Sequence, residues 1–289
     1  MIYLTPTHWK DYRLIDSGNF EKLEQFGSVV TRRPEPQAVW DKSLPEAEWQ
    51  KRSTIDFVAR SSNSGDWIKH KNIPDAWNLK YDYLNLTCNL KFTSFKHVGI
   101  FPEQAVNWDY INAICSANKG LKVLNLFGYT GIASIAARAA GAEVTHLDSV
   151  KQVVSWTKQN MESSGQDNIR WIVEDARKFV AKEVKRGNLY NGIIMDPPAF
   201  GRGANGEDWK LERDLNALLK DVEKILDKNR YFFILNTYSL GFSAFILENL
   251  VNEIFKNHKA PKEFGELYLE DDFKKKLPLG VIARFTNLK

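Results

Sequence analysis

The chain has 289 residues, of which 43% are hydrophobic, and a formal net charge of +4. This length suits one large domain with an appendage or two modest domains. No stretch approaches the roughly 18 consecutive apolar residues of a membrane helix, and residues 1–10 lack the apolar core of a signal peptide, so we expect a cytoplasmic protein. The two cysteines argue against a disulfide framework, and the five histidines are scattered, so we expect no metal site.

Residues 1–95 differ from the rest of the chain in composition and in hydrophobic pattern. Prolines punctuate short segments here, and five of the nine tryptophans lie in this stretch. Segments such as 79–86 alternate like strands, and no βα repeat is visible. We therefore predict a smaller, β-rich N-terminal region that could recognise a substrate. Its aromatic side chains could stack on nucleobases, although filling a small core is their more common role.

Residues 96–289 alternate between helical and strand-like segments. Helices are expected at 103–118, 132–140, 150–163, 176–186, 209–226 and 243–257, with seven apolar strands between and after them. The last two strands are joined by residues 270–278, which are too few for a parallel crossover, so this pair should be antiparallel. The fold class is therefore α/β, with a seven-stranded Rossmann-like sheet that is mostly parallel and has one antiparallel strand.

A glycine turn and three acidic residues lie at successive strand ends of this region. Residues 128–131 (GYTG) leave the first strand and open a helix, and Asp148, Asp175 and Asp196 end the next three strands. In open α/β sheets, small ligands bind at the carboxyl ends of the strands. Asp148 lies about 20 residues beyond the turn, where a carboxylate can accept both ribose hydroxyls of a nucleoside. Helix N-capping is the alternative role for Asp148 and Asp175.

These segments resemble the class I S-adenosylmethionine-dependent methyltransferases, and more narrowly the branch of the large-subunit ribosomal RNA cytosine-C5 and guanine-N7 methyltransferases. The resemblance lies in residues 124–131 (LNLFGYTG), 147–148 (LD), 174–176 (EDA) and 195–200 (MDPPAF). It extends to residues 96–104, which match the segment that closes over the methyl donor in this branch, and to the ending at 277–284. Residues 1–95 resemble uncharacterised bacterial members rather than the usual RNA-binding PUA module, which leaves the substrate open.

The resemblance implies S-adenosylmethionine as the cofactor. It implies a cofactor site made of Phe101, Gln104, Phe127, Gly128, Thr130, Gly131, Asp148, Ser149, Asp175, Ala176 and Asp196. Asp175 would meet the adenine amino group, and Asp196 would face the reacting end. A simple packing role is the alternative for Phe101 and Gln104.

Residues 196–200 (DPPAF) resemble the Asn/Asp-Pro-Pro-aromatic motif of enzymes that methylate amines or ring nitrogens. The Asp196 carboxylate or a proline carbonyl would accept a hydrogen bond from the target nitrogen, so that its lone pair points at the donor methyl. We predict Asp196, Pro197 and Phe200 as catalytic residues, with Phe200 stacking on a base. Arg202, in a glycine-rich loop at 201–207 that suits a lid, would bind a phosphate. The alternatives are a rigid strand exit and a flexible loop without function.

Methylation of cytosine at C5 would need a cysteine thiolate that adds at C6. Tyr238 stands where C5 enzymes of the resembled branch have a cysteine, and both Cys88 and Cys115 lie in apolar patterns typical of buried positions. The sequence therefore favours a nitrogen target, and a base of RNA, with ribosomal RNA the favoured partner. A methyltransferase acting on a small molecule or protein, and a cofactor-binding RNA-interaction protein without turnover, are the alternatives. The oligomeric state is left open.

Overall fold

The computed structural model describes residues 1–61, 64–203, 206–238 and 241–289. Their contacts divide the chain into two units. The α/β unit contains Met1–Leu4, Val106–Leu267 and Gly280–Lys289, and the β-rich unit contains Thr5–Ala105 and Tyr268–Leu279. Within the described residues, no helix is long and apolar enough to cross a membrane.

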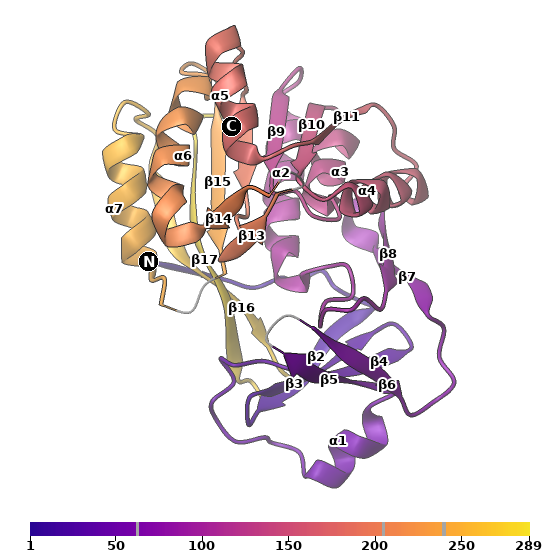
Figure 1. Ribbon diagram of the computed structural model, residues 1–289. Coiled ribbons are helices and arrows are strands. Elements are labelled where there is room, and N and C mark those ends of the chain that lie inside the picture. Colours follow the sequence, from indigo (N-terminus) through magenta and orange to yellow (C-terminus); the bar gives the residue numbers. More distant parts are fainter. Residues whose placement is uncertain (62–63, 204–205, 239–240) are drawn as a thin grey trace. The chain divides into compact units, whose positions relative to one another are not determined.

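The α/β unit is built on a sheet of eight strands in the order β1-β16-β17-β15-β12-β9-β10-β11 (Figure 1). The strands are β1 (Ile2–Leu4), β9 (Lys122–Leu126), β10 (Glu143–Asp148), β11 (Ile169–Val173), β12 (Gly192–Met195), β15 (Phe232–Thr237), β16 (Lys262–Glu270) and β17 (Lys276–Thr286). Strand β9 pairs in parallel with both β10 and β12, whereas β17 is antiparallel to β15. Strand order therefore reverses at β9, where a ligand crevice is expected.

The predicted α/β fold with a mostly parallel sheet and an antiparallel strand is confirmed. The sheet has one strand more than the predicted seven because β1 adds to its edge, parallel to β16. Three residues are too few to show an alternating pattern in the sequence, so this strand could be found only through its pairing.

Helices cover both faces of this sheet. They are α2 (Ala105–Ala117), α3 (Ile132–Ala139), α4 (Lys151–Ser163), α5 (Ala176–Arg186), α6 (Leu211–Ile225) and α7 (Ala244–Ile254). Side chains such as Leu126, Met195 and Leu235 from one sheet face join the apolar residues of α5, α6 and α7 in a single core. On the other face, residues of β9 and β10 meet α3 and α4, because successive strand residues point to opposite sides.

The β-rich unit contains a five-stranded sheet and a separate hairpin. The sheet has the order β2 (Tyr12–Gly18), β3 (Glu21–Phe26), β4 (Val29–Pro34), β5 (Ile55–Ser61) and β6 (Ser64–Lys69), with α1 (Glu46–Arg52) between β4 and β5. The hairpin joins β7 (Ala76–Tyr81) to β8 (Leu86–Lys91) through the short 3-10 helix η1 (Asp82–Leu84). The predicted β-rich N-terminal region is thereby confirmed.

The tryptophans of this unit are used in its own packing. Trp49 is fully buried beside Ile15 and Leu23. Each of the five indole N–H groups donates a hydrogen bond within the unit, to Pro102 O (Trp9), Ser17 O (Trp40), Asp16 Oδ2 (Trp49), Thr93 O (Trp67) and Phe26 O (Trp77). These bonds favour the structural role of the aromatic side chains over base stacking.

Asp16 connects three segments of the β-rich unit. Its buried carboxylate accepts hydrogen bonds from the Leu44 backbone N–H at 2.9 Å, the Trp49 indole at 2.8 Å and the Lys275 ammonium at 2.9 Å. Burial acts to raise the pKa of Asp16, but Lys275 and the N–H donors outweigh it and hold the pKa below its usual value. The charged carboxylate therefore stabilises the folded unit at neutral pH, and this contribution is lost as the pH falls through the lowered pKa.

Replacing Asp16 with asparagine should lower the free energy of unfolding by about 1–3 kcal/mol, because the Lys275 ammonium would lose one of its two carboxylate partners and keep only Asp271 at 3.6 Å. Urea titration followed by tryptophan fluorescence measures this change. The matched control is Asp272→Asn, because Asp272 lies on the same segment as Lys275 but is exposed. This variant should change the free energy of unfolding by less than about 0.5 kcal/mol. Equal effects of the two variants would show that Asp16 does not have this role.

Candidate functional site

The turn after β9 has an unusual backbone. Phe127 and Tyr129 have positive φ angles of 57° and 48°, and Gly131, the N-cap residue directly before α3, has a φ of +80°. A Cβ on Gly131 would lie 1.9 Å from Thr157 Cγ2 of α4. Only glycine therefore allows the turn to pack this closely on α4, and the close packing fixes the N–H groups at the start of α3.

A buried polar network lies beneath the turn. His146 of β10 is fully buried and its Nδ1 lies 3.0 Å from Ser134 Oγ, which accepts a hydrogen bond from Asn125 Nδ2 at 2.9 Å. Burial lowers the pKa of His146 to about 3, so the ring is neutral at physiological pH. A Cβ on Gly128 would lie 2.4 Å from this ring. The network thus packs against the turn and supports it. No pattern in the sequence predicted this network.

Two further side chains on α4 hold the turn by its carbonyl groups. Thr157 Oγ1 donates to Tyr129 O at 2.8 Å, and Asn160 Nδ2 donates to Thr130 O at 2.8 Å. Both donors are buried. Strand β9, the turn and α4 are therefore joined by packing as well as by hydrogen bonds.

Asp148 lies at the end of β10, where the sequence placed it. Its Oδ2 accepts from the Tyr129 N–H at 3.1 Å and its Oδ1 from the Val150 N–H at 2.9 Å, so the carboxylate links the turn to the segment before α4. Burial raises the pKa of Asp148 above its ordinary value, against the effect of these N–H donors. Ser149, the next residue, is half-buried.

Asp175 is the N-cap of α5. It accepts from the Lys178 N–H at 3.1 Å and forms an ion pair with Arg177 at 3.2 Å, and Ala176 behind it is buried. Arg177 also pairs with Asp214 at 3.2 Å. The capping role that sequence reasoning gave as the alternative is thus present, and the contact with adenine stays a prediction.

Asp196 follows β12 and has a partner on the neighbouring strand. Its Oδ1 accepts from Asn236 Nδ2, on β15, at 2.9 Å. Burial raises the pKa of Asp196 to about 6, although the Asn236 bond acts in the opposite direction. The carbonyl of Pro198 accepts from the Trp209 indole at 2.7 Å. One of the two lone pairs of the Pro198 carbonyl is thus used by Trp209, and acceptance of a hydrogen bond from a target nitrogen by Asp196 or a proline carbonyl stays a prediction.

The segment after the prolines is a small hairpin of β13 (Phe200–Arg202) and β14 (Asp208–Lys210). The predicted helix at 209–226 begins only at Leu211, because Trp209 belongs to β14. Trp209 is buried and its ring lies 5.1 Å from that of Phe127, whereas Phe200 is 69% exposed. Residues 204–205 of the predicted lid loop lie outside the described residues.

Phe101 precedes the short 3-10 helix η2 (Pro102–Gln104), and Gln104 is its last residue, directly before α2. The Phe101 ring lies 5.0 Å from that of His97 in a T-shaped contact. Both residues belong to the β-rich unit, whereas the other predicted cofactor residues belong to the α/β unit. Their role toward a cofactor stays a prediction.

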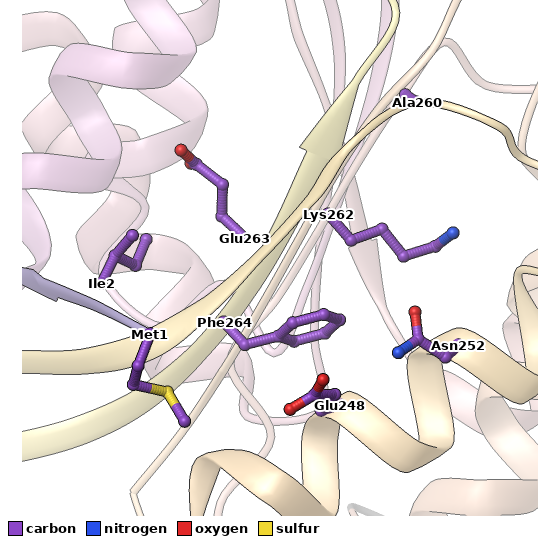
Figure 2. A pocket seen from close by; sticks show the side chains of 8 residues that line it. All are labelled: Met1, Ile2, Glu248, Asn252, Ala260, Lys262, Glu263 and Phe264. Atoms are coloured by element: carbon purple, nitrogen blue, oxygen red, sulfur yellow. The ribbon is translucent and has the colours of Figure 1, made fainter.

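A separate cavity of about 470 Å³ opens where β1 and β16 begin, beside α7 (Figure 2). It is lined by Met1, Ile2, Glu248, Asn252, Ala260, Lys262, Glu263 and Phe264. The Lys262 ammonium donates to His258 O at 3.0 Å, and Glu263 pairs with Arg284 at 2.6 Å. None of the predicted site residues lines this cavity. Among the residues that the structure describes, no group of three or more His, Cys, Asp or Glu side chains could hold a metal ion.

Comparisons with known proteins identify the family to which the chain belongs. The family model of the S-adenosylmethionine-dependent methyltransferases matches residues 45–266, more than half of the chain. The crystal structure of a SAM-dependent methyltransferase from Agrobacterium tumefaciens is 37% identical in sequence, with a TM-score of 0.93 over 99% of this chain and 93% of that chain.

Two curated relatives are named as ribosomal RNA methyltransferases. The large-subunit methyltransferase K/L of Shewanella pealeana is 29% identical over 88% of this chain and 35% of that protein. The large-subunit methyltransferase K of Neisseria meningitidis is 27% identical over 54% of this chain and 43% of that protein. The matched part therefore spans less than half the length of either relative.

Proposed function

The chain belongs to the S-adenosylmethionine-dependent methyltransferase family, and from that premise we propose that it methylates a base nitrogen of RNA, with ribosomal RNA as the favoured polymer. The observation that carries the nitrogen target is the half-buried Asp196 carboxylate, oriented by Asn236 and followed by two prolines. The relatives named as ribosomal RNA methyltransferases support the choice of RNA.

The residues at the strand ends fit the cofactor. The turn leads into the first turn of α3, the positive end of a helix, which suits the carboxylate of the donor's amino acid part. A carboxylate has about four acceptor sites, so Asp148 keeps capacity for a ribose hydroxyl besides its bonds to Tyr129 and Val150. We assign the cofactor to this turn with Asp148, Ser149, Asp175, Ala176 and Asp196, all of the α/β unit.

The bound cofactor supplies an electrophilic methyl group on a sulfonium centre. The chain's contribution is to hold the acceptor nitrogen in line with that group. Asn236 fixes the plane of the Asp196 carboxylate, which accepts a hydrogen bond from the target nitrogen, as the Pro197 carbonyl also can. The exposed ring of Phe200 stacks on a base, and Arg202 binds a phosphate.

The thiols do not suit a covalent route to carbon C5 of cytosine. Cys88 of β8 and Cys115 of α2 are both buried, and burial raises the pKa of each thiol to about 12. A nucleophilic thiolate is therefore nearly absent at neutral pH. A nitrogen acceptor needs no such step, since its own lone pair attacks the methyl group.

Replacing Asp148 with alanine should weaken binding of S-adenosylmethionine by about 1–3 kcal/mol, the usual scale for a hydrogen bond to a charged group. Isothermal titration calorimetry measures the dissociation constant, and circular dichroism checks that the fold is retained. The control is Asp167→Ala, an exposed aspartate on the same unit. Unchanged affinity in the folded Asp148→Ala protein would remove Asp148 from the cofactor site.

The double variant Cys88→Ser, Cys115→Ser should transfer methyl groups at the wild-type rate, because neither thiol takes part in the chemistry. The measurement is the initial rate of label transfer by protein whose melting temperature is close to that of the wild type. Each single variant serves as a control for damage to the core. Complete loss of activity in a well-folded double variant would instead support a thiol mechanism.

The proposed function is tested with radiolabelled S-adenosylmethionine and three substrate pools from a strain lacking the gene: total RNA, protein extract and metabolites. We expect label in RNA, and its loss in Asp196→Ala but not in Asp221→Ala, a half-buried aspartate of α6 that pairs with Lys224. Label in protein or metabolites alone would show that RNA is not the substrate, and no transfer to any pool would favour a binding protein without turnover.

The same assay should depend on pH through Asp196. Because burial raises the pKa of Asp196 to about 6, the carboxylate becomes protonated below that pH and loses acceptor capacity. The initial rate should therefore fall as the pH is lowered through about 6. In Asp196→Asn this limb should disappear from whatever rate remains, whereas its persistence would assign the titration to another group.

A further inference from the structure

The hairpin of β13 and β14 has two chemically different faces. Gly201 pairs across the hairpin with Trp209, and the flanking pairs are Phe200 with Lys210 and Arg202 with Asp208. Since side chains alternate along a strand and cross-strand partners share a face, the two flanking pairs lie on the face opposite to Trp209. Trp209 is 4% exposed, whereas Phe200 is 69% exposed. The face of Phe200, Arg202, Asp208 and Lys210 is hereafter the outer face.

On the outer face, the charged side chains that form no ion pair with a described residue are both cations. Asp208 pairs with Arg213 at 2.9 Å, and the neighbouring Glu207 pairs with Lys178 at 2.5 Å. Arg202 and Lys210 are exposed and form no ion pair with a described residue. An exposed aromatic ring is therefore directly opposite one cation and two residues from another on the same strand.

The hairpin is also firmly attached to the segment that follows Asp196. The Trp209 indole donates to Pro198 O at 2.7 Å, and the Leu211 N–H donates to Ala199 O at 3.0 Å. Trp209 further packs against Phe127, and Arg177 lies over its ring at 5.8 Å. The outer face is thus held in place before any substrate arrives, which lowers the entropy cost of binding.

We propose that the outer face binds one nucleotide step of single-stranded RNA, with a base stacked on Phe200 and the adjacent phosphate bound by Lys210 together with Arg202. This proposal rests on the proposed function. It adds that Lys210 binds a phosphate and that the RNA is single-stranded at this face. A base can stack on a protruding ring only when it is unpaired, and unpaired segments are where aromatic side chains read RNA. Cations beside the ring meet the backbone that connects stacked bases.

The test is fluorescence anisotropy without a methyl donor, using a 5′-labelled random-sequence 12-nucleotide RNA and an RNA duplex of the same length. The wild-type protein should bind the single strand more tightly. Phe200→Ala should weaken this binding by about 5- to 150-fold, the range for one stacked base, and Phe200→Trp should restore it. Lys210→Gln should reduce the slope of log K against log salt by about 0.7, the value for one phosphate contact on a single strand.

The matched control is Lys220→Gln, an exposed lysine on α6 that forms no ion pair with a described residue; it should leave affinity and slope unchanged. The proposal is overturned if the duplex binds as tightly as the single strand, if no RNA binds, or if Lys210→Gln keeps the wild-type slope. The methylation assay separates the two proposals. Label in RNA with an unchanged Lys210→Gln slope would reject the outer face alone, whereas the absence of both RNA label and RNA binding would reject both.

Discussion

The contact of the glycine turn with α4 and His146 is the constraint on which the site depends. Without side chains at Gly128 and Gly131, the turn comes close enough for α4 to hold its carbonyl groups through Thr157 and Asn160. This arrangement forces positive φ angles on Phe127 and Tyr129, a strain that the surrounding packing must offset. The result is a turn with a fixed backbone directly before α3, in which the N–H groups of Gly128, Tyr129 and Gly131 donate to Leu147 O, Asp148 Oδ2 and Gly128 O.

The same packing determines how the carboxylates behave. Asp148 is held between the turn and the start of α4, and Asp196, at the end of β12, is bonded to β15. Both side chains are half-buried, and this burial raises their pKa values. Asp175, which caps α5 beside Arg177, has a cation as its partner. Three acids in equivalent sequence positions therefore have different environments, which supports different roles for them.

The sequence pattern predicted the strands whose apolar residues form a continuous local run. It missed the elements that exist only through pairing with residues far away in the chain. The apolar runs before Asp148, Asp175 and Asp196 placed the strand ends correctly, because each run of apolar residues stops at or just before an acidic residue. The edge strand β1 has only three residues, and Trp209 belongs to β14 because of its pairing with Gly201 and its bond to Pro198. The network under the turn draws Asn125, Ser134, His146 and Thr157 from four elements, and no spacing along the chain connects them.

The hydrogen bond that orients Asp196 leaves one buried polar atom of Asn236 unsatisfied. Its Nδ2 donates to Asp196, while its Oδ1 is buried without a hydrogen-bond partner in the described structure, with space left by Gly280. An unsatisfied buried acceptor costs roughly 1–3 kcal/mol. Rotating the amide would turn its oxygen toward Asp196, which is favourable only when the carboxyl is protonated. The observed orientation therefore matches an ionised Asp196, the form that accepts a hydrogen bond from a target nitrogen, and the unsatisfied oxygen is explained by that requirement.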